Sequence, residues 1–162
     1  MDKLGLPPLV SNIRDGDVTW KKIESIDYEL LGYFLSCHLI IEYYMDEYLQ
    51  TRYPTLDWEN SKQTFAQKIA LLSKEKYPEK YNSIPAIKYL NGLRNKISHK
   101  IEFKITDEGL IPISQYLEKC CGNDKPLPDT PKEKLSLFTS MVCVWFAAKI
   151  SSYATHSKIT RK

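Results

Sequence analysis

Residues 94–99 carry side chains that suit chemistry on a phosphodiester. Arg94, Asn95, Ser98 and His99 supply a permanent cation, two neutral hydrogen-bonding groups and a group that exchanges protons near neutral pH. In RNA cleavage by the substrate's own 2′-hydroxyl, an imidazole can move the proton and a guanidinium can stabilise the charge that builds up on phosphorus. This chemistry needs no metal or cofactor, and the sequence shows no metal-ligand cluster. We therefore expect His99 to act as general acid or base, Arg94 as transition-state clamp and Asn95 as an orienting group.

The spacing of these residues sets a condition on the site. At about 100° per residue, Asn95 and His99 share one face of a helix, whereas Arg94 and His99 are roughly 140° apart. Both groups can reach one ligand if it lies in a groove, if the helix bends or if a second copy of the helix faces the first. The alternative is structural: Arg94 pairs with a carboxylate and His99 caps its own helix.

The run R-N-K-I-S-H at residues 94–99 resembles the R-x4-6-H signature of the HEPN superfamily. Its surroundings add to the likeness: an apolar helix pair upstream, F-x-x-K-I-x-L-L at 65–72, L-N-x-L-R-N at 90–95 and a further apolar helix downstream. The resemblance spans roughly residues 20–155. It implies a bundle of four to five helices and a metal-independent endoribonuclease, often a toxin or antiviral effector, that works as a dimer with two motifs facing across the two-fold axis.

The resemblance also suggests partners and products. RNA, a second copy of the chain and a cognate antitoxin protein are the expected partners, and the products would be a 2′,3′-cyclic phosphate and a 5′-hydroxyl. DNA lacks the 2′-hydroxyl and should survive. Some HEPN proteins have lost activity and serve as binding modules, which is the alternative function. Ile101 stands where one toxin branch has a tyrosine, so the chain departs from that branch.

Further site residues come from the neighbouring helices. Some HEPN ribonucleases carry an acidic residue on the helix before the motif, and Glu42 matches it by helix order. His38 lies four residues before Glu42 and is either a core histidine tied to Glu42 or a substrate contact. The other expected substrate contacts are Ser98, Lys96 and Lys100.

Two further lysines, Lys68 and Lys104, have two alternative roles each. Lys68 is expected to be a solvated lysine whose stem covers apolar surface, with a phosphate contact as the alternative. Lys104, like Lys100, is either a solvated side chain or a flank of a bound backbone. The net charge of +3 permits a polyanionic partner without demanding one.

Composition and length predict one folded domain. A chain of 162 residues with 43% hydrophobic and 12% aromatic residues can enclose a core. We divide it into an N-terminal arm at 1–18, a HEPN-like helical domain at 19–156 and a basic tail at 157–162. The four cysteines lack zinc-site spacing and are expected to be reduced thiols.

The termini and the apolar segments indicate a cytoplasmic protein. The N-terminus shows no signal peptide. The most apolar helical stretch, residues 135–148, is too short and too polar to span a bilayer, so no membrane partner is expected.

The predicted fold is mainly α. Apolar spacing and capping signals predict helices at about 20–50, with a possible break at Gly32, and at 64–74, 84–99, 114–121 and 131–154. Residues 101–113 change to an alternating pattern, I-E-F-K-I then T-D-E-G then L-I-P-I. This pattern predicts a small β-hairpin directly after the motif helix.

Overall fold

The computed structural model describes residues 9–21, 23, 26–100, 103–122 and 125–159. The fold is mainly α, as predicted, with five α-helices in this part of the chain. These are α1 (Tyr28–Arg52), α2 (Phe65–Leu72), α3 (Ile84–His99), α4 (Ile111–Cys121) and α5 (Pro131–Ile159), together with the short 3-10 turns η1 (Glu79–Tyr81) and η2 (Glu108–Leu110).

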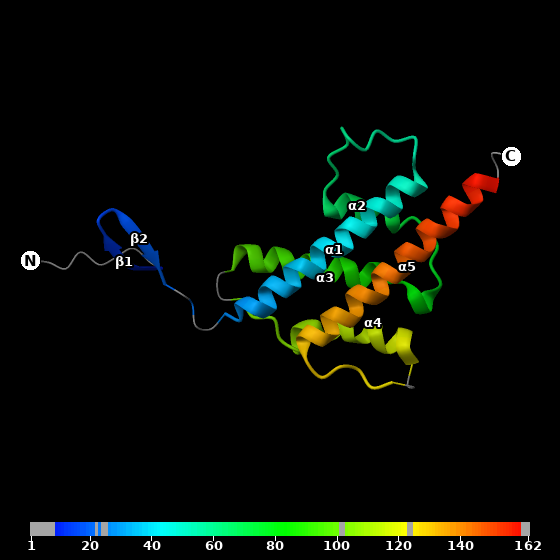
Figure 1. Cartoon of the computed structure of the whole chain (residues 1–162). Coiled ribbons are helices and arrows are strands. Elements are labelled where there is room, and N and C mark those ends of the chain that lie inside the picture. The colour runs from blue at the N-terminus through cyan, green and yellow to red at the C-terminus, as the bar shows by residue number, and fades with distance from the viewer. Residues whose placement is uncertain (1–8, 22, 24–25, 101–102, 123–124, 160–162) are drawn as a thin grey trace, which may run out of the picture.

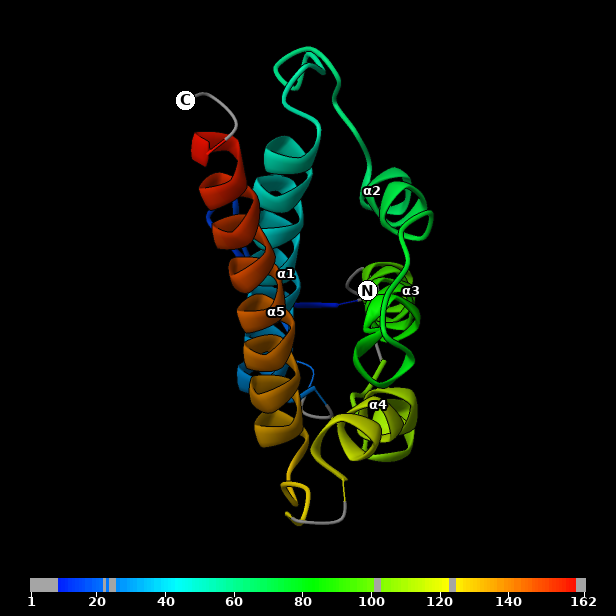
Figure 2. The ribbon, with the colours of Figure 1, turned by 90° about the vertical axis from the view of Figure 1, so that its right-hand side faces the viewer.

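The helices form two layers. Helices α1 and α5 make one layer, and α2, α3 and α4 make the other (Figures 1 and 2). Within their layer α1 and α5 run in the same direction. Lys132 Nζ lies 2.6 Å from Glu29 Oε1 at their starts, and the Arg52 guanidinium lies 5.3 Å from the centre of the Tyr153 ring at their ends.

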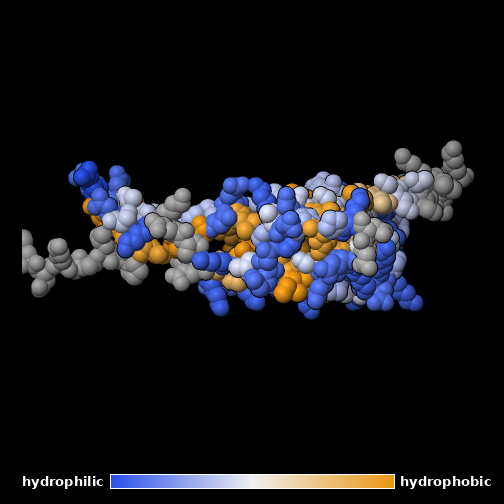
Figure 3. All heavy atoms as spheres, turned by 90° about the horizontal axis from the view of Figure 1, so that it is seen from below, coloured by the Kyte–Doolittle hydropathy of each residue, from blue (hydrophilic) through white to orange (hydrophobic). Residues whose placement is uncertain are grey.

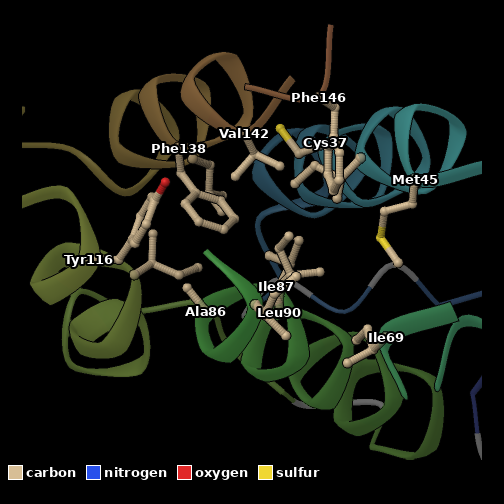
Figure 4. Packing of buried hydrophobic residues seen from close by; sticks show 14 of the residues in the cluster. Cys37, Met45, Ile69, Ala86, Ile87, Leu90, Tyr116, Phe138, Val142 and Phe146 are labelled. Atoms are coloured by element: carbon tan, nitrogen blue, oxygen red, sulfur yellow. The ribbon is translucent and has the colours of Figure 1, made fainter. Parts of the chain in front are cut away.

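The hydrophobic core fills the space between the layers, and α3 lies against its centre (Figure 4). Ile87 and Leu90 of α3 are fully buried and face residues of α1 and α5 such as Ile41 and Phe146, which are also fully buried. Burial of this much apolar surface is the main stabilising contribution to such a fold. It fixes one side of α3 and leaves the other side to solvent.

Local signals fix where the helices begin. Thr64 and Gln67 form a capping box at the start of α2, and the Thr130 hydroxyl accepts a hydrogen bond from the backbone N–H of Glu133 at the start of α5. The first helix begins at Tyr28 rather than near Trp20, because the Asp27 side chain caps it by accepting from the backbone N–H of Leu30. It then continues through Gly32 without a break.

The prediction of a β-hairpin directly after the motif helix is wrong. Residues 103–106 form no strand, and Ile111 to Ile113 lie in α4; Ile101, at the start of the predicted first strand, lies outside the described residues. Pro112 sits in the first turn of α4, where its missing N–H leaves no helical bond unmade. Leu110, Ile113 and Leu117 are all fully buried, a spacing of three and four residues that belongs to a helix.

The described β-structure lies in the predicted N-terminal arm at 1–18 and extends two residues beyond it, to Trp20. Strands β1 (Val10–Arg14) and β2 (Asp17–Trp20) pair antiparallel, and Figure 1 shows this hairpin apart from the helices. The turn between them consists of Asp15 and Gly16, whose φ values of 53° and 89° suit the tight two-residue hairpin turn that Asp-Gly favours.

Helix α5 is longer than the sequence pattern suggested. Over Pro131–Thr155 it is long and apolar enough to cross a membrane, by length and composition alone. The same helix contributes Leu135, Phe138, Val142 and Phe146 to the core, all fully buried. Its apolar character is thus used at least in part for packing inside the protein.

Hydrophobic side chains also reach the surface. Seen from the side of α4, they form patches between hydrophilic residues (Figure 3). On α1, the outward residues Leu35, Leu39 and Tyr43 are 36%, 65% and 59% exposed. They recur every four residues and so form one stripe along the helix. We call these three residues the α1 stripe.

The core of α3 can be tested with one residue type at two positions. Replacing the fully buried Leu90 with Ala should lower the free energy of unfolding by about 2–5 kcal/mol, because the deletion leaves a cavity between the layers. Leu56→Ala, at an exposed position outside the helices and outside the α1 stripe, should change it by less than about 0.5 kcal/mol. Urea denaturation of both variants measures the difference, and equal losses would contradict this placement of α3.

Candidate functional site

The motif residues lie at the C-terminal end of α3, on its solvent side. Leu93 is buried and Ile97 is half-buried, so the helix is anchored up to its last turn. Arg94, Asn95, Ser98 and His99 are all exposed. The Ser98 hydroxyl donates to the backbone carbonyl of Arg94 at 3.0 Å, an ordinary contact within one helix.

Arg94 and His99 form no contact with a carboxylate in the described part of the chain. The polar contact found for the Arg94 guanidinium is a long one, 3.5 Å from Nη1 to Asn95 Oδ1. Neither Arg94 nor His99 forms an ion pair within the described ranges. Helix α3 itself contains no acidic residue. The structural alternative for Arg94 requires a carboxylate partner, and this part of the chain offers none.

Arg94 and His99 do not share a face of α3. The helix is regular from Ile84 to His99, so the two side chains stay roughly 140° apart around its axis. A single chain therefore presents the guanidinium toward one side of α3 and the imidazole toward another. Bringing both to one phosphate requires a ligand that wraps the helix end or a second copy of the chain.

His38 lies inside the junction between α1 and α3. Its ring stacks on Phe65, with centroids 4.4 Å apart, and its Nε2 lies 3.2 Å from Asn91 Oδ1. Burial lowers the pKa of His38, and the nearby cations Arg94 and Lys68 act in the same direction. The hydrogen bond to Asn91 and the charge of Glu42 oppose that shift. The hydrogen bond that holds His38 goes to Asn91 and not to Glu42, the partner considered for it from the sequence.

Glu42 lies in an ion-pair cluster beside His38. Lys68 Nζ is 2.8 Å from Glu42 Oε1 and 2.9 Å from Asp46, which lies one turn further along α1. Burial alone would lower the pKa of Lys68, but hydrogen bonds to the two carboxylates outweigh it and raise the pKa above its ordinary value. The prediction that Lys68 is solvated is wrong, since the residue is only 8% exposed.

The cluster could have been anticipated in part. Glu42 and Asp46 are four residues apart and so form an acidic pair on one side of α1. A catalytic role for Glu42 stays a prediction, and in this structure its carboxylate holds the α2 lysine.

The remaining predicted contacts are exposed on or beside α3. Lys96 lies in the last turn, and Lys100 follows as the C-cap residue. Lysines and histidine at this end of a helix are favoured by the macrodipole. Lys104 is also exposed, in the irregular segment that follows. Sequence reasoning missed Lys88, which shares a groove with Lys96; the spacing of eight residues places the two lysines two turns apart and about 80° from each other around the axis.

The described residues contain no group of three His, Cys, Asp or Glu side chains placed as metal ligands. Comparison of the chain with family models, curated proteins and solved structures gives no match. The likeness to HEPN proteins therefore rests on residues 94–99 and their surroundings in the sequence.

The buried histidine gives a pH-dependent prediction. Because the pKa of His38 is lower in the folded protein than in the unfolded chain, the unfolded chain binds more protons just below neutral pH. Stability should therefore fall as the pH drops from 7.5 through the ordinary histidine pKa of about 6.5. His38→Gln can keep a hydrogen bond to Asn91 but cannot titrate.

Urea denaturation at pH 7.5 and 5.5 measures this effect. The loss of stability on acidification should be smaller in His38→Gln than in the wild type, with His99→Gln, an exposed histidine, as the matched control. An identical loss in the wild type and His38→Gln would show that His38 does not sense its surroundings in this way.

Proposed function

We propose that this protein is a metal-independent endoribonuclease of HEPN type that cleaves single-stranded RNA as a homodimer. The observation that carries the proposal is the exposure of Arg94 and His99 together with their lack of ion-pair partners in the described residues. Both are exposed at the end of a helix whose opposite side is buried, and neither has a carboxylate partner in the described part of the chain. A guanidinium and an imidazole left unpaired on a rigid element suit the binding of a phosphodiester.

The chemistry follows from these two groups. His99 takes the proton of the substrate's 2′-hydroxyl or supplies one to the departing 5′-oxygen. The 2′-oxygen forms a bond to phosphorus while the bond from phosphorus to the 5′-oxygen breaks, which leaves a 2′,3′-cyclic phosphate and a 5′-hydroxyl. Arg94 stabilises the extra negative charge on the phosphorus in between, and Asn95 orients the phosphate by hydrogen bonding.

A second copy of the chain allows a guanidinium and an imidazole to meet at one phosphate, which a single α3 helix does not allow. Since Arg94 and His99 point roughly 140° apart, a two-fold arrangement of two α3 ends brings Arg94 of one protomer to the phosphate served by His99 of the other. The α1 stripe favours such a dimer, because Leu35, Leu39 and Tyr43 expose apolar surface on the helix that packs against α3 through His38 and Asn91.

A non-catalytic dimeric module that binds RNA, nucleotide or a partner protein is the second candidate. The position of Glu42 favours it, because this carboxylate is held by Lys68 and is not free to assist at the motif. In the first case the setting we propose is a cytoplasmic toxin–antitoxin or antiviral system with a cognate antitoxin protein. In the second case Arg94 and His99 bind a phosphate without cleaving it.

Substitution of the motif residues separates the two functions. His99→Ala should slow cleavage of a labelled single-stranded RNA by about 10²–10⁴-fold, the usual contribution of a general acid or base. Arg94→Ala should slow it by about 10²-fold or more, as expected when a group that stabilises transition-state charge is lost. The assay is run with chelator present and includes an all-deoxy oligonucleotide, which should remain intact.

Lys74→Ala, an exposed lysine on another part of the surface, is the control and should cleave normally. Cleavage that chelator abolishes would contradict the mechanism. Equal activity of the wild type, His99→Ala and Arg94→Ala would contradict the assignment of the site. No cleavage by any folded, dimeric variant would leave the binding module as the function.

The dimer can be tested at the α1 stripe. Leu39→Lys should convert dimers to monomers, because it places a charge in the proposed interface, and cleavage should fall with the dimer fraction. Light scattering after size exclusion measures the mass. Ile111→Lys, at an exposed apolar position on α4, is the matched control and should remain dimeric. A dimeric Leu39→Lys protein with full activity would rule out this interface.

A further inference from the structure

A groove runs along one flank of α3, between the buried Leu93 and the exposed Lys88. It has a volume of about 360 Å³ and is lined by Pro85, Lys88, Tyr89, Gly92, Leu93 and Lys96. Lys88 and Lys96 stand eight residues apart, roughly 12 Å along the helix axis. They thus place two ammonium groups along one groove.

The groove points along the helix toward the motif. At about 100° per residue, Lys88, Gly92 and His99 fall within roughly 40° of one another around the axis, and Lys96 lies about 60° from His99. A chain that follows the groove from its Lys88 end therefore reaches the imidazole of His99. Arg94 lies on a different side of the helix and does not belong to this path.

The charges in the groove are unpaired. Elsewhere in the protein, Lys68, Lys119, Lys132 and Lys134 each form an ion pair with a carboxylate. Among the described residues, neither Lys88 nor Lys96 forms an ion pair with a carboxylate, and α3 contains no acidic residue. An exposed groove with two unpaired ammonium groups attracts a polyanion.

The rest of the lining suits a nucleic-acid strand. Gly92 has no side chain between the two lysines, and a Cβ added there would meet no atom within 4 Å, so the middle of the groove is open to a ligand. The Tyr89 hydroxyl donates to the backbone carbonyl of Gly109 at 2.9 Å, which holds the ring in place as one wall. A fixed aromatic ring beside a basic path can contact a base or ribose of any sequence.

We propose that single-stranded RNA enters along this groove, with two successive parts of its phosphate backbone on Lys88 and Lys96, and reaches the scissile phosphate at His99. This inference rests on the proposed function and assigns the part of the substrate that flanks the cleaved bond. Because both contacts go to phosphates, the groove adds affinity without base specificity.

The test measures RNA binding separately from cleavage. A fluorescein-labelled single-stranded RNA is titrated with the His99→Ala protein, with and without the added pair Lys88→Ala and Lys96→Ala, at several salt concentrations. Each phosphate contact contributes about 0.7 to the slope of log affinity against log salt for single strands, so losing two should reduce the slope by about 1.4. The matched control adds Lys74→Ala and Lys125→Ala, two exposed lysines outside the groove, and should keep the slope.

Each outcome decides the inference. A smaller slope in the groove variant alone supports it, even if the wild type cleaves no RNA, because the groove then serves the binding module. An unchanged slope overturns it, even if the wild type does cleave RNA, and leaves the proposed function intact. Vesicles of anionic lipid that displace the RNA as well as free RNA does, at equal phosphate concentration, would also overturn it, because the site would then be a membrane-binding surface.

Discussion

The burial of one side of α3 between the two layers is the constraint on which the site depends. Ile87 and Leu90 are fully enclosed by residues of the other helices, so α3 cannot turn about its axis without exposing them. With 3.6 residues per turn, fixing this side also fixes the direction of every other side chain on the helix. The exposure of Arg94, Asn95 and His99 is a consequence of that packing rather than a separate design.

The paired charges near the core and the unpaired cations on α3 lie in different parts of the molecule. Carboxylates near the core are already engaged: Glu42 and Asp46 hold Lys68, and Glu75 accepts a hydrogen bond from the Tyr48 hydroxyl and lies 3.8 Å from the Arg52 guanidinium. These pairs stabilise the contacts of α1 with α2 and with the loop that follows α2. Helix α3 itself contains no acidic residue, so its cations have no carboxylate on their own helix and keep their charge available for a ligand.

Sequence patterns anticipated those helices whose signals are local. The capping signal at Thr130 and the apolar spacing at 64–74 and 84–99 place the starts of three helices within a residue or two. The alternating pattern at residues 101–113 led to a wrong strand prediction, because a short apolar run with one proline fits either a strand or the first turn of a helix. Packing of Leu110, Ile113 and Leu117 into the core decided for the helix. The Asp15-Gly16 turn signal was visible, but the strands on either side of it were not predicted.

By itself, the sequence determined that the chain is mainly helical, that α3 has one apolar and one polar side, and that Arg94 and His99 lie on different sides of it, since these follow from composition and the helical period. Only the tertiary structure decided which charges are free. Lys68 and Lys96 look alike in the sequence, yet the first is buried between two carboxylates of α1 and the second stands in an open groove. The physical reason is that an ion pair forms only between side chains that come within a few ångströms of each other. Lys68 is 26 positions from Glu42 and 22 from Asp46 in the sequence, so it meets them only when the two layers pack.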